Sequence, residues 1–218
     1  MRKFNKNVRN ATAALAVGTA TMLAWVFAAT DESKAVYVAH LQAMNGTITG
    51  LPTSGEARFS AVGDELTISV TAHGVPPDLV HWQHFHGFSN NRAASCPGAA
   101  ADVNGDGIID LIETEPAAGT TMVPFDDNPL AMDVAHGNYP KASDAATYAY
   151  RQTVSLNGLT AAFAKAFNEP TLDLDRRVVF IHGVVASSQL PSSVASLGSI
   201  PAHVTLPIAC GRIERLKR

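Results

Sequence analysis

The sequence has little charge and no concentration of positive charge in its body. Charged residues make up 16% of the 218 residues and hydrophobic residues 46%, which is enough apolar material for a core and argues against global disorder. The net charge is −3, and no cluster of Lys and Arg lies outside the termini, which argues against a nucleic-acid partner. The length fits one domain with a leader, or at most two small domains.

Cysteine is also scarce, and no internal repeat is visible. The chain has two cysteines, Cys96 and Cys210. In an exported protein an even number favours a disulfide, although two buried free thiols are the alternative. No Ser-His-Asp or Cys-His catalytic arrangement can be argued from the sequence, since the cysteines are better used as a disulfide.

The first 34 residues have the pattern of a signal peptide. Four cations, namely Arg2, Lys3, Lys6 and Arg9, precede the uncharged stretch 10–30, and small residues offer cleavage after Ala28 or Ala35. The alternative is an uncleaved membrane anchor, because 21 uncharged residues can just span a bilayer. Both interpretations export the remainder, to the periplasm, the cell surface or the medium. Loss of the four cations changes the net charge from −3 to −7.

The body, residues 35–214, has the pattern of short strands separated by Gly, Pro, Asn and Asp, and a basic tail (215–218) follows it. The alternation in 65–72 predicts a half-buried antiparallel strand, and the apolar run 177–185 predicts a central one. A short helix is predicted over 160–167. The other predicted strands are 35–41, 148–156 and 204–208.

The stretch 89–143 is rich in Gly, Pro, Asn, Asp and Ala and has little periodicity. A loop that long in a compact domain is usually functional. We therefore expect an all-β antiparallel barrel or sandwich with one large insertion loop.

A histidine cluster directly precedes this stretch, in the sequence HWQHFHGF of residues 81–88. His84 and His86 alternate, so on a strand both imidazoles point to the same side and can chelate one copper or zinc ion. His81 would face elsewhere. The alternative is a set of surface or core histidines without metal.

These residues resemble the copper-ligand strand of the Cu/Zn superoxide dismutases, with Cys96 in the place of the family's loop cysteine. The segment 206–211 (LPIACG) is similar to the family's second-cysteine segment. The run 178–182 (VVFIH) is similar to a strand that supplies another copper histidine. The Gly-Val-Pro-Pro turn at 74–77 also fits, and the likeness covers most of residues 35–214.

The resemblance implies a Greek-key β-barrel with copper on His84, His86 and His182. It further implies that His81 is a structural neighbour of the site and that Cys96 and Cys210 form a disulfide.

The sequence departs from the family in three places. The position of the bridging histidine falls near Asp102, and no histidine occurs between His86 and His136. Of the zinc ligands, only His136 and Asp144 remain as possible remnants, so zinc is not expected. Pro207 stands where the family has a guiding arginine. Because that arginine attracts the superoxide anion, its absence with a charge near −7 predicts slow capture.

Residues 102–113 (DVNGDGIIDLIE) fit every position of an EF-hand calcium loop. The alternative is an acidic turn without metal. Because the flanking segments are weak as helices, we expect a lone calcium loop that replaces zinc in ordering the insertion. The expected ligands are Asp102, Asn104, Asp106, the Ile108 carbonyl, Asp110 and Glu113.

Two functions compete. The first is an exported copper protein of the dismutase type, with calcium in its loop and superoxide dismutation at a reduced rate. The second is a non-catalytic copper- or calcium-binding domain for storage or adhesion. The three histidines favour the first, whereas the missing bridging histidine and arginine favour the second. The full calcium pattern disfavours a third interpretation, a purely structural β domain with degenerate sites.

Overall fold

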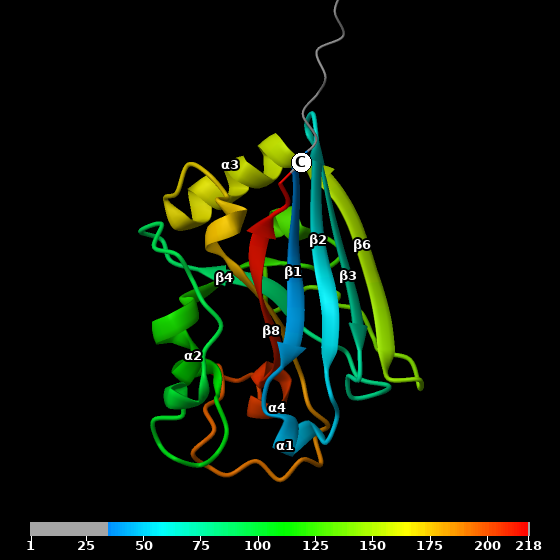
Figure 1. Ribbon diagram of the computed structural model, residues 1–218, viewed down its shortest axis with the longest axis vertical. Helices are drawn as coiled ribbons and strands as arrows, with labels where there is room; N and C mark the ends of the chain where they lie inside the picture. Colours follow the sequence, from blue (N-terminus) through cyan, green and yellow to red (C-terminus); the bar gives the residue numbers. More distant parts are fainter. Residues whose placement is uncertain (1–34, 218) are drawn as a thin grey trace, which may run out of the picture. The chain divides into compact units, whose positions relative to one another are not determined.

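A computed structural model describes residues 35–217 (Figure 1). The expected leader, residues 1–34, lies outside the described residues. No helix among those described is long and apolar enough to cross a membrane. The described strands form one eight-stranded sheet in the order β5-β4-β7-β8-β1-β2-β3-β6, with every pairing antiparallel. The strands are β1 (Ala35–Ala43), β2 (Ser54–Val62), β3 (Glu65–His73), β4 (Gln83–Gly87), β5 (Thr120–Pro124), β6 (Thr147–Ser155), β7 (Val178–His182) and β8 (Pro207–Arg215).

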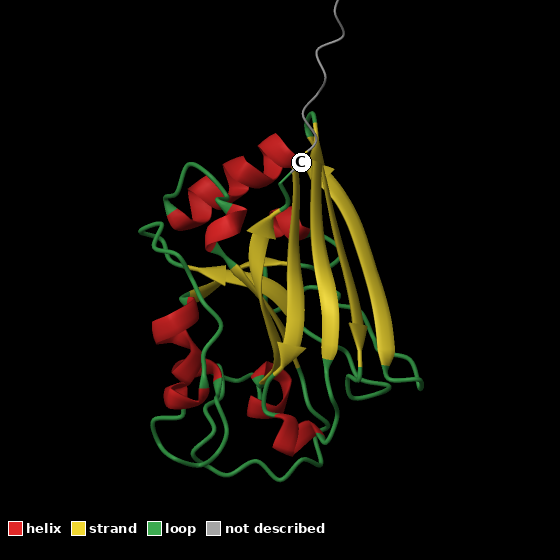
Figure 2. Cartoon of the chain, in the orientation of Figure 1, coloured by secondary structure: helices red, strands yellow, loops and turns green. Residues whose placement is uncertain are grey.

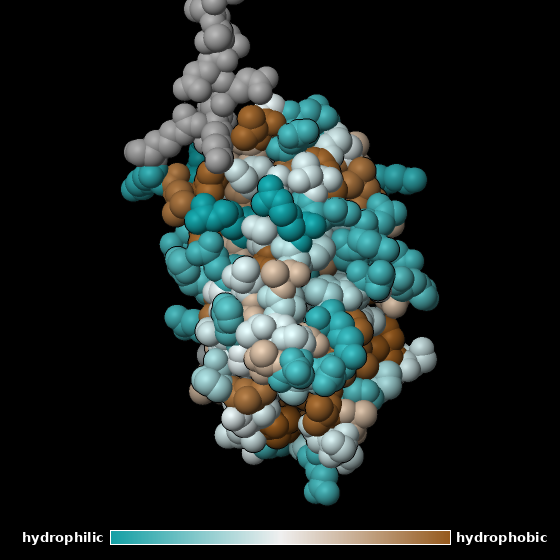
Figure 3. Space-filling model, turned by 90° about the vertical axis from the view of Figure 1, so that its right-hand side faces the viewer, coloured by the Kyte–Doolittle hydropathy of each residue, from teal (hydrophilic) through white to brown (hydrophobic). Residues whose placement is uncertain are grey.

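The sheet curls around a core of apolar side chains, which confirms the all-β expectation. The Phe125 ring, directly after β5, lies 5.6 Å from that of Phe59 on β2 and 6.2 Å from that of Phe85 on β4, although β2 and β4 lie far apart in the sheet order. Strands with one solvent-facing side alternate in burial, as β3 does, while β4 and β7 are buried throughout. Figure 3 shows the side that carries β6, where hydrophilic residues lie among separate hydrophobic groups.

Of the helices, α3 (Leu156–Phe167) lies at one end of the long strands, α1 (Gly46–Thr49) and α4 (Ala202–Thr205) lie at the other, and α2 (Leu111–Ala118) lies to one side (Figures 1 and 2). The longest, α3, begins where the Ser155 hydroxyl accepts a hydrogen bond from Gly158 N and ends at Asn168, whose φ is 57°. It buries Leu159 and Phe163, and the Phe163 ring lies 6.0 Å from that of Phe85. Turns of 3-10 helix lie at Ala99–Ala101, Pro129–Ala131 and Leu174–Arg176.

The predictions for 35–41, 65–72 and 148–156 are confirmed within two residues, and the predicted helix is confirmed in a longer form. The prediction for 177–185 ran too long, because β7 ends at His182 and Gly183 has a φ of 113°, which extended backbone does not adopt. The predicted strand 204–208 was wrong at its start. Leu206 N donates to Ala202 O in the turn of α4, and β8 begins only at Pro207.

The insertion 89–143 is more structured than its composition indicates. It contains α2 and β5, and β5 pairs with β4 at one edge of the sheet. The expectation of weak helical flanks is wrong on the C-terminal side. The Asp110 side chain caps α2 by accepting from Ile112 N and Glu113 N, and the Glu113 carboxylate accepts from Asp110 N. This capping box stabilises a helix that is only eight residues long.

The disulfide expected between Cys96 and Cys210 is present, with a Cα–Cα distance of 5.8 Å. It joins the insertion to β8 beside a second, smaller apolar cluster that includes Met44, Val178 and Phe180. Because thiols stay reduced in the cytosol, a structural disulfide indicates a non-reducing environment.

Candidate metal centre

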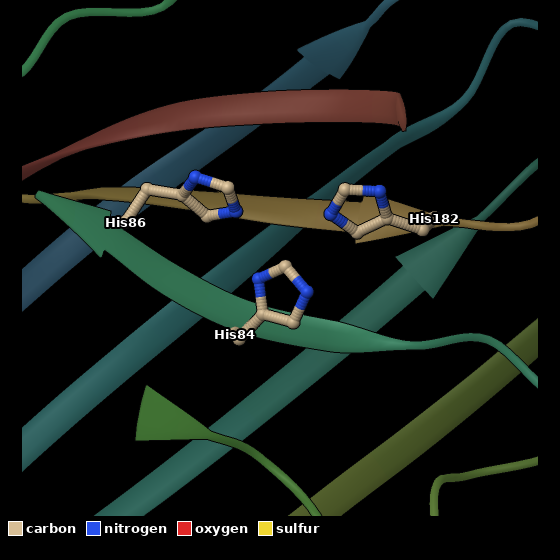
Figure 4. Close-up of side chains that lie close together, drawn as sticks. All are labelled: His84, His86 and His182. Carbon is tan, nitrogen blue, oxygen red and sulfur yellow. The ribbon is translucent and has the colours of Figure 1, made fainter. Parts of the chain in front are cut away.

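Three histidines from two neighbouring strands meet inside the molecule. His84 and His86 lie on β4, and His182 ends β7, which pairs with β4 in antiparallel register. Each side chain offers a ring nitrogen, and the three nitrogens all lie within 4.8 Å of one another. Figure 4 shows the rings turned toward a common point, with nitrogens of His86 and His182 facing each other. The period of two places His84 and His86 on one face, as the sequence predicted.

Hydrogen bonds from outside the cluster orient two of the rings. His182 Nδ1 lies 2.7 Å from Thr205 O, and His86 Nδ1 lies 3.2 Å from Gly119 O. A carbonyl only accepts, so both Nδ1 atoms carry the proton and both Nε2 atoms keep a lone pair. Backbone carbonyls that bond the second ring nitrogen are the usual supports of metal-binding histidines. The Thr121 hydroxyl lies 3.1 Å from His86 Nε2.

Two nitrogens in the cluster have no hydrogen-bond partner although they are buried. They are His84 Nδ1 and His182 Nε2. A buried polar atom without a partner costs roughly 1–3 kcal/mol, so such an atom calls for a specific explanation. A metal ion accepting both lone pairs would satisfy these two atoms together, and the donor set of three neutral imidazoles fits one.

The environment keeps the cluster neutral. Burial lowers the pKa of His86 to about 3, and repulsion from a charged His182 contributes. Burial lowers the pKa of His182 to about 4, against the raising effect of its bond to Thr205. Burial also holds the pKa of His84 well below its usual range, with repulsion from His182 and then His86 adding to it. At neutral pH all three lone pairs are therefore free of protons.

The metal-free protein should lose stability as the pH falls below 6.5. The folded-state pKa values of His86 (about 3) and His182 (about 4) lie below the ordinary histidine value of 6.5, so the unfolded chain binds more protons from pH 6.5 down to these values. Each histidine then destabilises the fold by about 1.4 kcal/mol per pH unit in that window. Urea unfolding at pH 6 and 5 with chelator should show a shallower slope for His86→Gln than for wild type. Thr121→Val keeps all three histidines and should retain the wild-type slope; equal slopes for His86→Gln and wild type would contradict the assignment.

The cluster opens onto a small cavity of about 10 Å³, which is room for about one water-sized particle. A larger pocket of about 270 Å³ lies on the His86 side and contains one charged residue, Glu115, in its lining. The cavity is lined by Trp82, His84, Leu111, Thr121, Val134, His182, Leu197 and Thr205.

The remaining predicted residues lie elsewhere. His81 is buried, and its ring nitrogens face two backbone carbonyls, His182 O and Pro76 O, each at 2.9 Å, so neither nitrogen is turned to the cluster. His136 is exposed and bonds Asp133 at 2.9 Å, and Asp144 is exposed on a turn. Pro207 is buried at the start of β8.

The calcium-type loop is closed by its own hydrogen bonds. Asp102 accepts from the backbone N–H groups of residues 105, 106 and 107, and Glu113 accepts from those of residues 103, 104 and 110. Asn104 Oδ1 accepts from Asp106 N, and the carboxylate of Asp106 accepts from Ile108 N. Among residues 35–217, the carboxylates of this loop do not form a group as tight as the histidine cluster.

The sequence missed the groups that orient and cover the histidines. The Gly119 and Thr205 carbonyls belong to the backbone, and every residue has one, so the residue type does not predict which carbonyls bond the histidines. Thr121 lies on an edge strand that the low periodicity of the insertion concealed. Leu197 lies in a loop that returns from a distant part of the chain.

The fold and the site thus define an all-β, disulfide-bonded protein with a three-histidine cluster able to hold a metal ion. Comparison with models of known protein families and with curated proteins gives no match to this chain.

Proposed function

We propose that this chain is an exported copper-binding protein with copper on His84, His86 and His182, and with the Greek-key barrel of the dismutase family it resembles. The observation that carries the proposal is the pair of buried, unpartnered lone pairs on His84 Nδ1 and His182 Nε2 beside His86 Nε2. Imidazoles suit copper, zinc, iron and nickel, and copper binds most tightly of the divalent first-row ions to a given nitrogen site. His136 and Asp144 do not support a second, zinc-binding site.

Superoxide dismutation at a reduced rate is the reaction that this proposal includes. Bound copper would supply a centre that alternates between two oxidation states. The residues around the site would have to admit and orient the superoxide anion. Their charges do not favour the binding of an anion. The pocket beside His86 has Glu115 in its lining and no Lys or Arg, and Pro207 stands where the resemblance expects the arginine. Without electrostatic steering, anion capture would be slow.

A non-catalytic copper-holding domain is the second candidate. The observation that favours it is the size of the cavity beside His84 and His182, about 10 Å³, with Leu111 and Leu197 in its wall. A substrate would have to displace this apolar cover before reaching the metal.

Metal analysis and a superoxide assay on the same preparation would test the proposal and separate the two candidates. We expect one copper per chain after loading and dialysis. A dismutation rate above that of free copper at equal concentration supports the enzyme, and copper binding without activity supports the holding domain. No copper above the level of a His84→Ala variant would contradict both.

The leader is part of this proposal, since the resemblance and the signal-peptide pattern point to export. The Cys96–Cys210 disulfide supports a non-reducing compartment such as the periplasm or the cell exterior. Contact with a membrane is proposed only for a chain whose leader stays uncleaved.

We also propose that loop 102–113 binds one calcium ion, on the strength of its ligand spacing. Ligand binding to the native state alone should raise the free energy of unfolding by about 2.7 kcal/mol at a hundredfold excess over the dissociation constant. Glu113→Gln removes the bidentate anionic ligand and should abolish most of that gain. Thermal unfolding with calcium and with chelator measures it.

Glu115→Gln is the matched control, because Glu115 is an exposed residue of the same helix outside the loop pattern. It should respond to calcium as wild type does. A wild-type midpoint that calcium leaves unchanged would show that the loop is an acidic turn without metal.

A further inference from the structure

Two leucines line both of the spaces that adjoin the histidine cluster. Leu111 and Leu197 line both the small cavity that contains His84 and His182 and the larger pocket that contains His86. Leu111 is the first residue of α2, and Leu197 lies in the loop between β7 and α4. Leu197 is 47% exposed, so this part of the cavity wall also faces solvent.

The same buried carboxylate, that of Asp110, bonds the backbone of the two segments that carry these leucines. Asp110 Oδ1 caps the helix that Leu111 begins, at 2.9 Å from Ile112 N and 3.1 Å from Glu113 N. Asp110 Oδ2 accepts from Ala195 N at 2.6 Å, two residues before Leu197. The two oxygens of one side chain, itself 3% exposed, thus hold two segments that are 85 residues apart.

Two neighbouring contacts hold the same stretch of chain. The Ser193 hydroxyl donates to Asp106 Oδ2 at 2.5 Å, and Val194 is buried in the main core. Residues 193–197, hereafter the strap, are therefore attached at three consecutive positions and reach the cavity wall at Leu197. Of the two hydrogen bonds, the one to Asp110 is partly buried, lies nearer to Leu197 along the chain and is charge-assisted, and charge-assisted bonds are roughly twice as strong as neutral ones.

We infer that Asp110 is a positioning residue that keeps the strap closed over the three histidines and so sets how fast a metal enters or leaves their site. The identity of the metal as copper rests on the proposed function. The closure itself rests only on the contacts of Asp110, Ala195 and Leu197. Asp110 and Asp106 also belong to the loop proposed for calcium, so the tests below use calcium-free buffer.

Asp110→Asn tests the link with the least disturbance. Asparagine is as good a helix N-cap as aspartate, so its oxygen can keep the bonds to α2. The NH₂ group of asparagine would then take the place of Oδ2 and face Ala195 N–H. Because both groups are donors, the hydrogen bond to the strap would be lost. We expect copper release from the loaded protein to a chelator to accelerate at least about tenfold, which a loss of one such bond of about 1.4 kcal/mol would produce. Copper stoichiometry should stay at one per chain.

Asp64→Asn is the matched control. Asp64 also joins two segments through its carboxylate, at 2.7 Å from Asn157 N and 2.8 Å from Ser155 Oγ, but on the turn between β2 and β3. Its release rate should equal that of wild type. Leu197→Ala shortens the cover without touching Asp110 and should also accelerate release.

The double variant Asp110→Asn with Leu197→Ala distinguishes closure from general loosening. If Asp110 acts through Leu197, the double variant releases copper no faster than the faster single variant. Rates that multiply would overturn the inference, because two independent effects would then be at work.

A metal-free measurement separates this inference from the copper assignment. Diethyl pyrocarbonate modifies accessible neutral imidazoles, and mass spectrometry can follow its addition to His84 and His182. We expect at least about tenfold faster modification in Asp110→Asn than in wild type or Asp64→Asn, by the same 1.4 kcal/mol estimate. If the wild type takes up no copper, the proposed function is refuted, and the modification rates of His84 and His182 still test the role of the strap. Equal modification rates in Asp110→Asn and wild type would overturn the role of the strap.

Discussion

Replacing His84 and His182 together by alanine is expected to abolish stoichiometric Cu(II) binding. The two side chains supply two of the three lone pairs, and His86 alone would remain with its Nε2 next to the Thr121 hydroxyl. Loss of a residue that merely orients a ligand typically weakens a metal site by roughly 10–100-fold, so loss of two ligands should exceed that range. Isothermal titration of the metal-free protein with Cu(II), in a buffer that competes for copper, measures the change.

The control is His136→Ala, because the His136 side chain is 82% exposed and bonds Asp133. It should bind one Cu(II) with the wild-type affinity. Far-UV circular dichroism must show that the double variant is folded. This is expected because His84 makes no side-chain hydrogen bond and His182 makes one. Unchanged copper binding by the folded double variant would refute the assignment of the site.

Removal of the Cys96–Cys210 disulfide should lower the free energy of unfolding by about 4–5 kcal/mol. The bridge spans 114 residues, and closing a loop of that size restricts the unfolded chain by this amount in the chain-entropy model. The double variant Cys96→Ser with Cys210→Ser avoids free thiols. Urea unfolding of wild type and variant, followed by tryptophan fluorescence, measures the difference.

As a control, the urea unfolding of wild type and of the double variant is repeated in the presence of a phosphine reductant. The reductant should bring wild type close to the double variant and leave the variant unchanged. Thiol titration of the unfolded, unreduced wild type should find no free thiol, since the described residues hold no free cysteine. Two titratable thiols, or a variant as stable as wild type, would contradict the prediction.

The sheet was predictable where one face of a strand meets solvent. The alternation in β3 identifies its buried residues because side chains on a strand point to opposite faces in turn. The same argument failed over 204–208, where the apparent alternation belongs to a helical turn followed by the start of β8. It also missed β5, because Thr120–Pro124 is short and lies beside β4 only through tertiary pairing.

The sequence by itself determined the chemistry that is available to the site. The spacing of His84 and His86 makes them neighbours on any strand, whatever the rest of the fold does. The apolar run 177–185, which contains His182, likewise predicts a buried histidine on a central strand. The family resemblance, rather than spacing, joined the third histidine to the other two and Cys96 to Cys210.

Only the tertiary structure decided how these groups are arranged. The pairing of β4 with β7 brings His182 to His84, and no local pattern encodes that pairing. Backbone carbonyls of Gly119 and Thr205 select which ring nitrogen keeps its lone pair, and every residue carries such a carbonyl. The cover over the site depends on Asp110 reaching Ala195, 85 residues away. The physical reason is that side-chain period and residue type act locally, whereas a metal site and its closure need groups that meet only when the sheet has formed.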